Sequence, residues 1–112
     1  MMYKVIITEP AEKDMQSAVS YIADTLGNKI AAANLLDAAD KAVLSLSDFP
    51  ERNPLVRDAL LAANGFRMQR INNYLAFYVI NSETQTVSIL RVIHSRRDWA
   101  SILKNEMGGS QE

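Results

Sequence analysis

The spacing of hydrophobic residues changes once along the chain, near residue 50. Between residues 11 and 46, apolar residues recur every three or four positions, which is the period of an amphipathic α-helix. Between residues 66 and 94, they form short runs and alternations of two, as β-strands do. A β-branched run, Val5-Ile6-Ile7, precedes the helical part and predicts a strand over residues 2–8. The expected order is therefore a strand, two helices, three strands and a last helix.

The two predicted helices have recognisable boundaries. Thr8 or Glu9 is expected to cap the first helix and Gly27 to end it, whereas Asn28 caps the second and Phe49-Pro50 ends it. Because only one or two residues link them, the helices are expected to pair as an antiparallel hairpin. Their apolar stripes form one predicted buried surface: Ala11, Met15, Ala18, Val19, Ile22 and Leu26, then Ala32, Leu35, Leu36, Ala39, Ala42, Val43 and Leu46.

The second half of the chain contains a β-hairpin signal. Asn72-Asn73 separates two strand-like runs, and Asn tolerates the positive φ that two-residue turns require. A further strand is predicted over residues 86–94, and a short helix with Trp99 on its apolar face opens at Arg97 or Asp98. Residues 50–64 form a connection with one helical turn near residues 55–62.

The parity of these strands predicts which side chains share a face of the sheet. The face expected under the helices carries Phe66, Met68, Leu75, Phe77 and Val79, and the face expected to be open carries Arg67, Gln69, Tyr74 and Tyr78. In the last strand, the period of two assigns Val87, Ile89, Arg91 and Ile93 to the core, and Ser88, Leu90, Val92 and His94 to the other side. His94 would then join Arg67 and Tyr78 on the open face, unless a β-bulge intervenes.

The order of elements predicts an α+β fold, in which the helix hairpin covers one face of a small, mostly antiparallel sheet. The 112 residues fit one domain, expected over residues 1–105. Residues 106–112, which end in GGSQE, are expected to form a disordered tail.

Charge is distributed unevenly, although the formal net charge is only −1. Residues 1–50 carry four Lys against seven acidic residues, whereas residues 51–112 carry seven Arg and one Lys against six. Arg makes rigid bidentate contacts with phosphate or carboxylate, so the second half is a candidate anion-binding surface. The alternative is that these Arg residues pair with nearby acids.

Composition also restricts the chemistry and the location. With no cysteine, disulfides, a Cys-based zinc site and a thiol nucleophile are excluded. The longest apolar run, LAFYVI, is too short to cross a bilayer, and MMYKVIITEP lacks the apolar stretch of a signal peptide. We therefore expect a cytoplasmic protein that has no membrane partner.

The stretch ILRVIHSRRDWASIL, residues 89–103, concentrates the candidate chemistry. His94 is the only histidine of the chain, and it fits either proton transfer or a hydrogen bond to the backbone. Arg91 is expected to pair with an acid of the helix hairpin or with Asp98, or else to bind an anion. Trp99 is expected to anchor the last helix by packing.

The segment GFRMQRINNYLAFYVINSETQTVSILRVIHSRRDW, residues 65–99, resembles the RelE/ParE superfamily of bacterial toxins. It shares a Gly-x-Arg opening, a Tyr-x-x-Phe-Tyr strand, a polar turn and an Arg-Val-x-His-x-x-Arg-Asp ending. The resemblance covers about residues 3–103 and implies the small α+β toxin fold, without cofactor or metal. It also implies the toxin of a type II toxin–antitoxin (plasmid stabilisation) module, in a hetero-oligomer with an antitoxin protein that wraps around it.

The resemblance leaves two targets open, because RelE-like members cleave mRNA on the ribosome without a metal and ParE-like members inhibit DNA gyrase without hydrolysis. We expect mRNA cleavage first, gyrase inhibition as the alternative, and a non-toxic antitoxin-binding protein third. By resemblance, the residues expected to be catalytic in a metal-independent endoribonuclease are His94, Arg67, Tyr78 and Arg91. The residues expected to bind the target are Arg96, Arg97, Arg70, Arg57 and Arg52. The chain departs from nuclease members in lacking a Lys in the connection before the second strand and a Tyr in the last helix.

Overall fold

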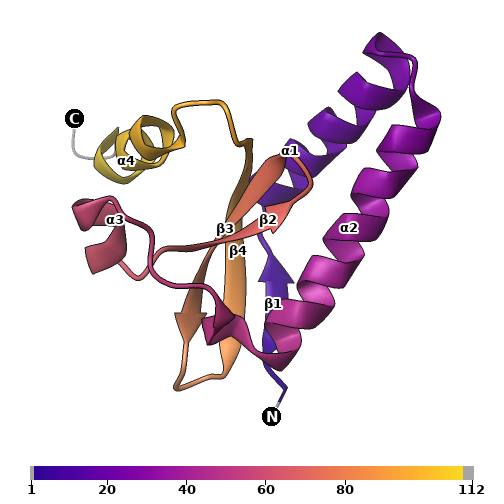
Figure 1. Cartoon of the computed structure of the whole chain (residues 1–112). Coiled ribbons are helices and arrows are strands. Elements are labelled where there is room, and N and C mark those ends of the chain that lie inside the picture. Colours follow the sequence, from indigo (N-terminus) through magenta and orange to yellow (C-terminus); the bar gives the residue numbers. More distant parts are fainter. Residues whose placement is uncertain (1, 110–112) are drawn as a thin grey trace.

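Figure 1 shows the computed structural model of the chain, which describes residues 2–109. A four-stranded sheet has the strand order β1-β4-β3-β2. Strands β2, β3 and β4 form an antiparallel meander, and β1 pairs with β4 in parallel. The predicted α+β order is confirmed, with these elements: β1 (Lys4–Ile7), α1 (Glu9–Ser20), a π-helical turn (Tyr21–Thr25), α2 (Lys29–Asp48), a 3-10 turn (Pro50–Arg52), α3 (Ala59–Ala63), β2 (Arg67–Ile71), β3 (Tyr74–Asn81), β4 (Thr86–His94) and α4 (Trp99–Gly109).

The helix hairpin has the predicted ends. Asn28 Oδ1 accepts a hydrogen bond of 2.9 Å from the Ala31 N–H, and Gly27 adopts the left-handed φ of +65° that favours glycine. Thr8 occupies the cap position of α1, but its hydroxyl donates instead to the Ile89 carbonyl at 2.8 Å and so ties the helix start to β4. Two residues of the predicted buried stripe, Leu26 and Leu36, are exposed instead.

The β-hairpin has the predicted register. Ile71 faces Tyr74 and Arg67 faces Tyr78, and Asn72 has a φ of +56° in the turn. Local sequence therefore determines both the position of the turn and the partners of every residue in β2.

The prediction of which face lies under the helix hairpin is wrong. Figure 1 shows α1 and α2 on one side of the sheet and α3 and α4 on the other. The hairpin covers the face predicted to be open, where Tyr78 is 0% exposed among Ala76, Val87 and Ile89. The face predicted to lie under the hairpin packs against α3 and α4, through Val56, Leu61, Phe66, Leu75, Phe77, Ile93 and Leu103. Parity gives the residues that share a face, but it does not say which helices cover that face.

A β-bulge in β4 changes the predicted parity of the last strand. Phe77 is paired with Arg91 and Tyr78 with Ile89, so Leu90 is an extra residue without an opposed partner. Arg91 and Ile93 therefore lie on the opposite side of the sheet from Val87 and Ile89, contrary to the simple period of two. With this extra residue, His94 is opposite Tyr74, which lies four positions from Tyr78 along β3.

Asp14 of α1 occupies the edge of β4 where β1 has ended. The last pair of the parallel ladder joins Ile7 to Ile89, so the Val92 N–H has no strand partner on that side. Asp14 Oδ2 accepts this N–H at 2.9 Å and the Arg91 Nε at 2.6 Å, and Asp14 Oδ1 accepts Arg91 Nη2 at 3.0 Å. The predicted ion pair between Arg91 and an acid of the hairpin is thus confirmed, and the hydrogen bonds that Arg91 donates to Asp14 raise the pKa of Arg91.

The same guanidinium reaches the last helix. Arg91 Nη1 forms an ion pair with Glu106 of α4, so one side chain connects α1, β4 and α4. Lys104 of α4 pairs with Asp58, the cap of α3, at 2.7 Å. Trp99 packs on Phe77 with ring centroids 5.1 Å apart, which confirms its predicted anchoring role. Helix α4 runs to Gly109, and the rest of the predicted tail lies outside the described residues.

The hydroxyl of Tyr78 organises the connection after α2. It donates to the Pro50 carbonyl at 2.6 Å and accepts from Asn53 Nδ2 at 3.1 Å. The Asn53 carbonyl in turn accepts a hydrogen bond from Arg67 Nη1. Burial raises the pKa of Tyr78, so this phenol stays protonated at neutral pH.

We expect the substitution Tyr78→Phe to lower the free energy of unfolding by about 1–3 kcal/mol, because the Pro50 carbonyl and the Asn53 amide lose their partner in a buried site. The measurement is urea unfolding followed by circular dichroism. Tyr21→Phe is the matched control, since Tyr21 is 52% exposed and should change stability by less than about 0.5 kcal/mol. Equal effects of the two substitutions would contradict this account of Tyr78.

We expect Asp14→Asn to lower the free energy of unfolding by roughly 1–3 kcal/mol, because Arg91 loses its paired carboxylate at a site with little solvent exposure. Asp37→Asn, on the exposed side of α2, serves as control and should be nearly neutral. Amide hydrogen exchange at Val92 provides a second readout. Because the Asn amide keeps an oxygen acceptor, this readout uses Asp14→Ala, and unchanged Val92 protection in that variant would contradict the capping of the strand edge.

Candidate functional site

The turn after β4 presents two adjacent arginines to solvent. The Arg97 N–H donates to the His94 carbonyl at 3.0 Å, and the Trp99 N–H donates to the Arg97 carbonyl at 2.8 Å. The Ser95 N–H bonds the Asn73 carbonyl at 2.9 Å, which fixes the turn to the β2–β3 hairpin. Arg96 and Arg97 are both exposed, and neither forms an ion pair with the residues that the structure describes.

His94 stabilises this turn through its ring. Its Nδ1 accepts a hydrogen bond of 3.1 Å from the Arg96 N–H. A neutral imidazole that accepts at Nδ1 carries its proton on Nε2, so it presents a donor to its surroundings. In this arrangement the Nε2 side of the ring is the one that can contact a partner. Of the two interpretations of His94 from the sequence, the hydrogen bond to the backbone is the one observed.

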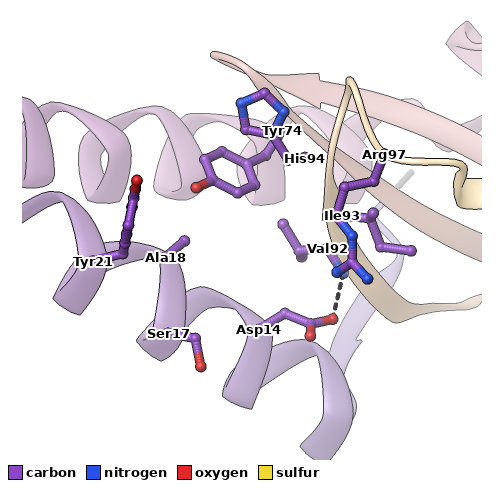
Figure 2. A pocket seen from close by; sticks show the side chains of 9 residues that line it. All are labelled: Asp14, Ser17, Ala18, Tyr21, Tyr74, Val92, Ile93, His94 and Arg97. Atoms are coloured by element: carbon purple, nitrogen blue, oxygen red, sulfur yellow. Dashed lines mark hydrogen bonds between the residues drawn. The ribbon is translucent and has the colours of Figure 1, made fainter. Parts of the chain in front are cut away.

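A pocket of about 410 Å³ opens beside His94, which we call the His94 pocket (Figure 2). One wall is α1 with its π-helical end, and the other is formed by the start of β3 and the end of β4. The polar residues that line it are Asp14, Ser17, Tyr21, Tyr74, His94 and Arg97, and Ala18, Val92 and Ile93 supply apolar surface.

Aromatic rings form much of the surface of the His94 pocket. Tyr74 and His94 meet edge to face, with centroids 5.1 Å apart and an interplanar angle of 77°. Burial, and to a smaller extent Tyr21, raises the pKa of Tyr74. The Tyr74 hydroxyl therefore stays protonated at neutral pH and acts as a hydrogen-bonding group.

The charge available in the His94 pocket is positive. The carboxylate of Asp14 is already engaged by Arg91 and by the Val92 N–H. Arg97 has no acidic partner among residues 2–109. Together, Arg97, the His94 Nε2–H and the tyrosine hydroxyls can hold an acidic or aromatic group of a partner.

The four residues predicted to be catalytic do not converge. Tyr78 lies four positions from Tyr74 along β3, a separation of about 13 Å, so it is distant from His94. Arg67 is half-buried on the hairpin-facing side and bonds the Asn53 carbonyl. Arg91 is held by Asp14 and Glu106. His94 does share a face of the sheet with Arg67 and Tyr78, as expected, but the helix hairpin covers that face, so the expectation that it is open is wrong.

The five arginines predicted to bind the target fall into three places. Arg96 and Arg97 lie in the turn after β4, and Arg57 is exposed just before α3. Arg52 and Arg70 line a separate cavity between α2 and β2. The structure thus brings Arg96 next to Arg97 and Arg52 near Arg70, but the five arginines do not form one surface.

Sequence reasoning missed the contribution of α1 to the His94 pocket. Asp14, Ser17 and Tyr21 recur at spacings of three and four, so they lie along one side of the helix, next to the apolar stripe. That spacing indicates a polar side of the helix that could line a site, whereas the apolar stripe indicates only the buried side. Among residues 2–109, no cluster of His, Asp and Glu has the makings of a metal site, and no helix has the length and hydropathy needed to cross a membrane.

Comparison with solved structures places the fold among bacterial toxins. The chain is 28% identical to a chain of the toxin–antitoxin complex RelBE2 from Mycobacterium tuberculosis, covering 84% of this chain and 99% of that one with a TM-score of 0.58. A chain of the chromosomal ParDE system from P. aeruginosa is 14% identical, with coverages of 83% and 96% and a TM-score of 0.66. A mutant of the E. coli toxin RelE in the free state is 16% identical, with coverages of 94% and 98% and a TM-score of 0.59.

Comparison of sequences gives the family. No curated protein matches the chain. The profile of the family described as "ParE toxin of type II toxin-antitoxin system, parDE" matches residues 5–99, which is most of the chain. This match confirms the resemblance drawn from residues 65–99, and the chain belongs to the ParE toxin family of type II toxin–antitoxin systems.

Proposed function

We propose that this toxin stops growth by binding DNA gyrase and inhibiting it, without cleaving nucleic acid. The observation that carries the proposal is the state of the residues expected to cleave mRNA, since three of the four are engaged within the fold and only His94 lines an accessible pocket. Metal-free cleavage requires a proton acceptor, a proton donor and cations placed over one phosphate. Inhibition by binding requires only a complementary surface.

Tyr78 and Arg91 serve the fold instead of a reaction. The Tyr78 ring is fully buried and its hydroxyl is bound on both sides, by Pro50 and Asn53. Arg91 is held by two carboxylates, from Asp14 and Glu106. Releasing either side chain for catalysis would break contacts that hold α1, α4 or the connection after α2.

The opposite face of the sheet offers no alternative catalytic site. It is covered by α3 and α4, and its buried residues are all apolar: Val56, Leu61, Phe66, Leu75, Phe77, Ile93 and Leu103. A general acid or base would have to come from outside this cluster. Both faces of the sheet therefore support packing more than chemistry.

The surface suited to a target lies at the end of β4. It combines the exposed Arg96 and Arg97 with the His94 pocket, where two tyrosines provide aromatic contact area. Arginine and tyrosine are the residue types enriched at energetically important positions of protein interfaces. We infer that this surface contacts gyrase, and that a cognate antitoxin is the partner that neutralises the toxin.

One observation favours ribosome-dependent mRNA cleavage as the second candidate. The solved structure that is 28% identical to this chain comes from a complex named RelBE2, not from a ParDE complex. The two candidates predict different results in the same assays.

We expect the purified toxin to inhibit DNA supercoiling by gyrase and to leave mRNA intact on translating ribosomes. His94→Gln should keep its inhibitory potency within about threefold, because no proton is transferred. In a nuclease, the same substitution should reduce cleavage by about 10²- to 10⁴-fold. Cleaved mRNA together with undisturbed supercoiling would overturn the proposal in favour of the second candidate.

The double substitution Arg96→Gln/Arg97→Gln should raise the concentration needed for half-inhibition of gyrase by roughly tenfold, with a weaker salt dependence, since two exposed interface charges are lost. Stability should change by less than about 0.5 kcal/mol per site. The matched control is Lys13→Gln/Lys29→Gln, which removes two exposed charges elsewhere. Equal loss of potency in both double variants would mean that net charge, not this surface, determines binding.

A further inference from the structure

A second cavity lies between α2 and β2, away from the His94 pocket. Its volume is about 280 Å³, and we call it the α2–β2 groove. On the helix side, its wall consists of small residues, Ala38, Ala42 and Ser45, which share one side of α2 at spacings of four and three. Because these side chains are short, they leave space between the helix and the strand. Residues 69–72 form the opposite wall.

Three cations line the α2–β2 groove, and no acid does. Lys41 comes from α2, Arg52 from the 3-10 turn and Arg70 from β2. None of the three forms an ion pair among residues 2–109. Arg70 Nη1 donates to the Asn72 carbonyl at 3.1 Å, which orients this guanidinium and leaves its other N–H groups available.

Neutral hydrogen-bonding groups accompany the three cations. Asn72 lines the groove, and so does Gln69, whose amide already accepts from Asn53 Nδ2 and donates to the Arg70 carbonyl. The Ser45 Oγ is buried and has no hydrogen-bond partner among the residues that the structure describes. An unsatisfied buried hydroxyl calls for an explanation, and rotation about the Cα–Cβ bond would turn it toward a ligand in the groove.

We propose that the α2–β2 groove binds a phosphate of a nucleic-acid backbone. Two guanidinium forks and an ammonium match the geometry and charge of a phosphate. The cavity volume is close to the lower limit for ligand pockets, which suits a phosphate with part of its sugar. An acidic peptide fits less well, because none of the exposed large apolar side chains lines the groove to anchor it.

This inference does not depend on which target the toxin has. Gyrase acts on DNA and the ribosome carries mRNA, so either target offers a phosphate backbone next to the bound toxin. The groove would add affinity and orientation on top of the protein contacts made at the His94 pocket. It needs no base contacts, and so binding should be insensitive to sequence.

The test is fluorescence anisotropy with labelled single-stranded and duplex DNA of mixed sequence, at several salt concentrations from 50 to 200 mM, with the full-length chain. Arg52→Gln and Arg70→Gln should each raise the Kd roughly threefold to tenfold. Each should also reduce the slope of log K against log salt by about 0.7 for single strands or 0.9 for duplex. Lys29→Gln is the matched control, an exposed cation outside the groove, and should change neither quantity.

Lys41→Gln, on a different element, provides an independent variant with the same expected effect, and thermal unfolding verifies that every variant is folded. No DNA binding by the wild type at 50 mM salt would overturn the proposal. So would equal losses in the Lys29→Gln control, which would indicate diffuse attraction. Binding of inorganic phosphate without binding of the strand, measured by calorimetry, would reject the backbone in favour of a free phosphate. Competition by polyglutamate as strong as by DNA would assign the groove to an acidic protein segment.

Discussion

The unequal lengths of two neighbouring strands impose the constraint on which the rest of the structure depends. β1 has four residues and β4 has nine, so the second half of β4 has an edge that no strand covers. An exposed edge is an unstable and aggregation-prone feature unless it is blocked. Asp14 blocks it by accepting the Val92 N–H, and the negative charge placed there draws in Arg91. This carboxylate, together with the Thr8 hydroxyl bonded to Ile89, holds α1 against the sheet.

The position of the His94 pocket follows from this arrangement. Because α1 is held against β4 at Asp14, the next turns of the helix, which carry Ser17 and Tyr21, lie beside the end of β4. The ion pair between Arg91 and Glu106 holds α4 from the other side of the same strand. The turn with Arg96 and Arg97 follows the strand end that α1 and α4 hold, and the Arg91 guanidinium connects these two helices. Damage at Asp14 would therefore affect the recognition surface as well as stability.

Signals between neighbouring residues predict most of the helices, strands and turns, but the prediction of which face of the sheet the helix hairpin covers is wrong. The Asn72-Asn73 turn fixed the β2–β3 register, and Asn28 capped α2 as expected, because both features depend on adjacent residues. The burial of Tyr78 under the hairpin and the bulge at Leu90 depend on contacts between distant segments. Helix α3 has only five residues, which is too short for a helical period to be recognised in the sequence. The sequence therefore does not predict that this helix covers a face of the sheet.

The candidate site shows the same division. The exposure of Arg96 and Arg97 and the pairing of Arg91 with a hairpin acid were predictable, because charges at a strand end either reach solvent or find a partner. The convergence of Asp14, Tyr21 and Tyr74 with His94 was not predicted, since it depends on the bulge that realigns β4. The extra residue at the bulge places His94 opposite Tyr74 and on the face of the sheet that α1 covers.

The clustering of arginine in the second half of the chain has two explanations that apply to different residues. Arg67 and Arg91 are structural, since they satisfy a backbone carbonyl and two carboxylates at positions with little solvent access. Arg52, Arg57, Arg96 and Arg97 have no acidic partner among residues 2–109, and their charge is available to other molecules. A chain arranged in this way presents cations to an anionic partner at several separate points of its surface.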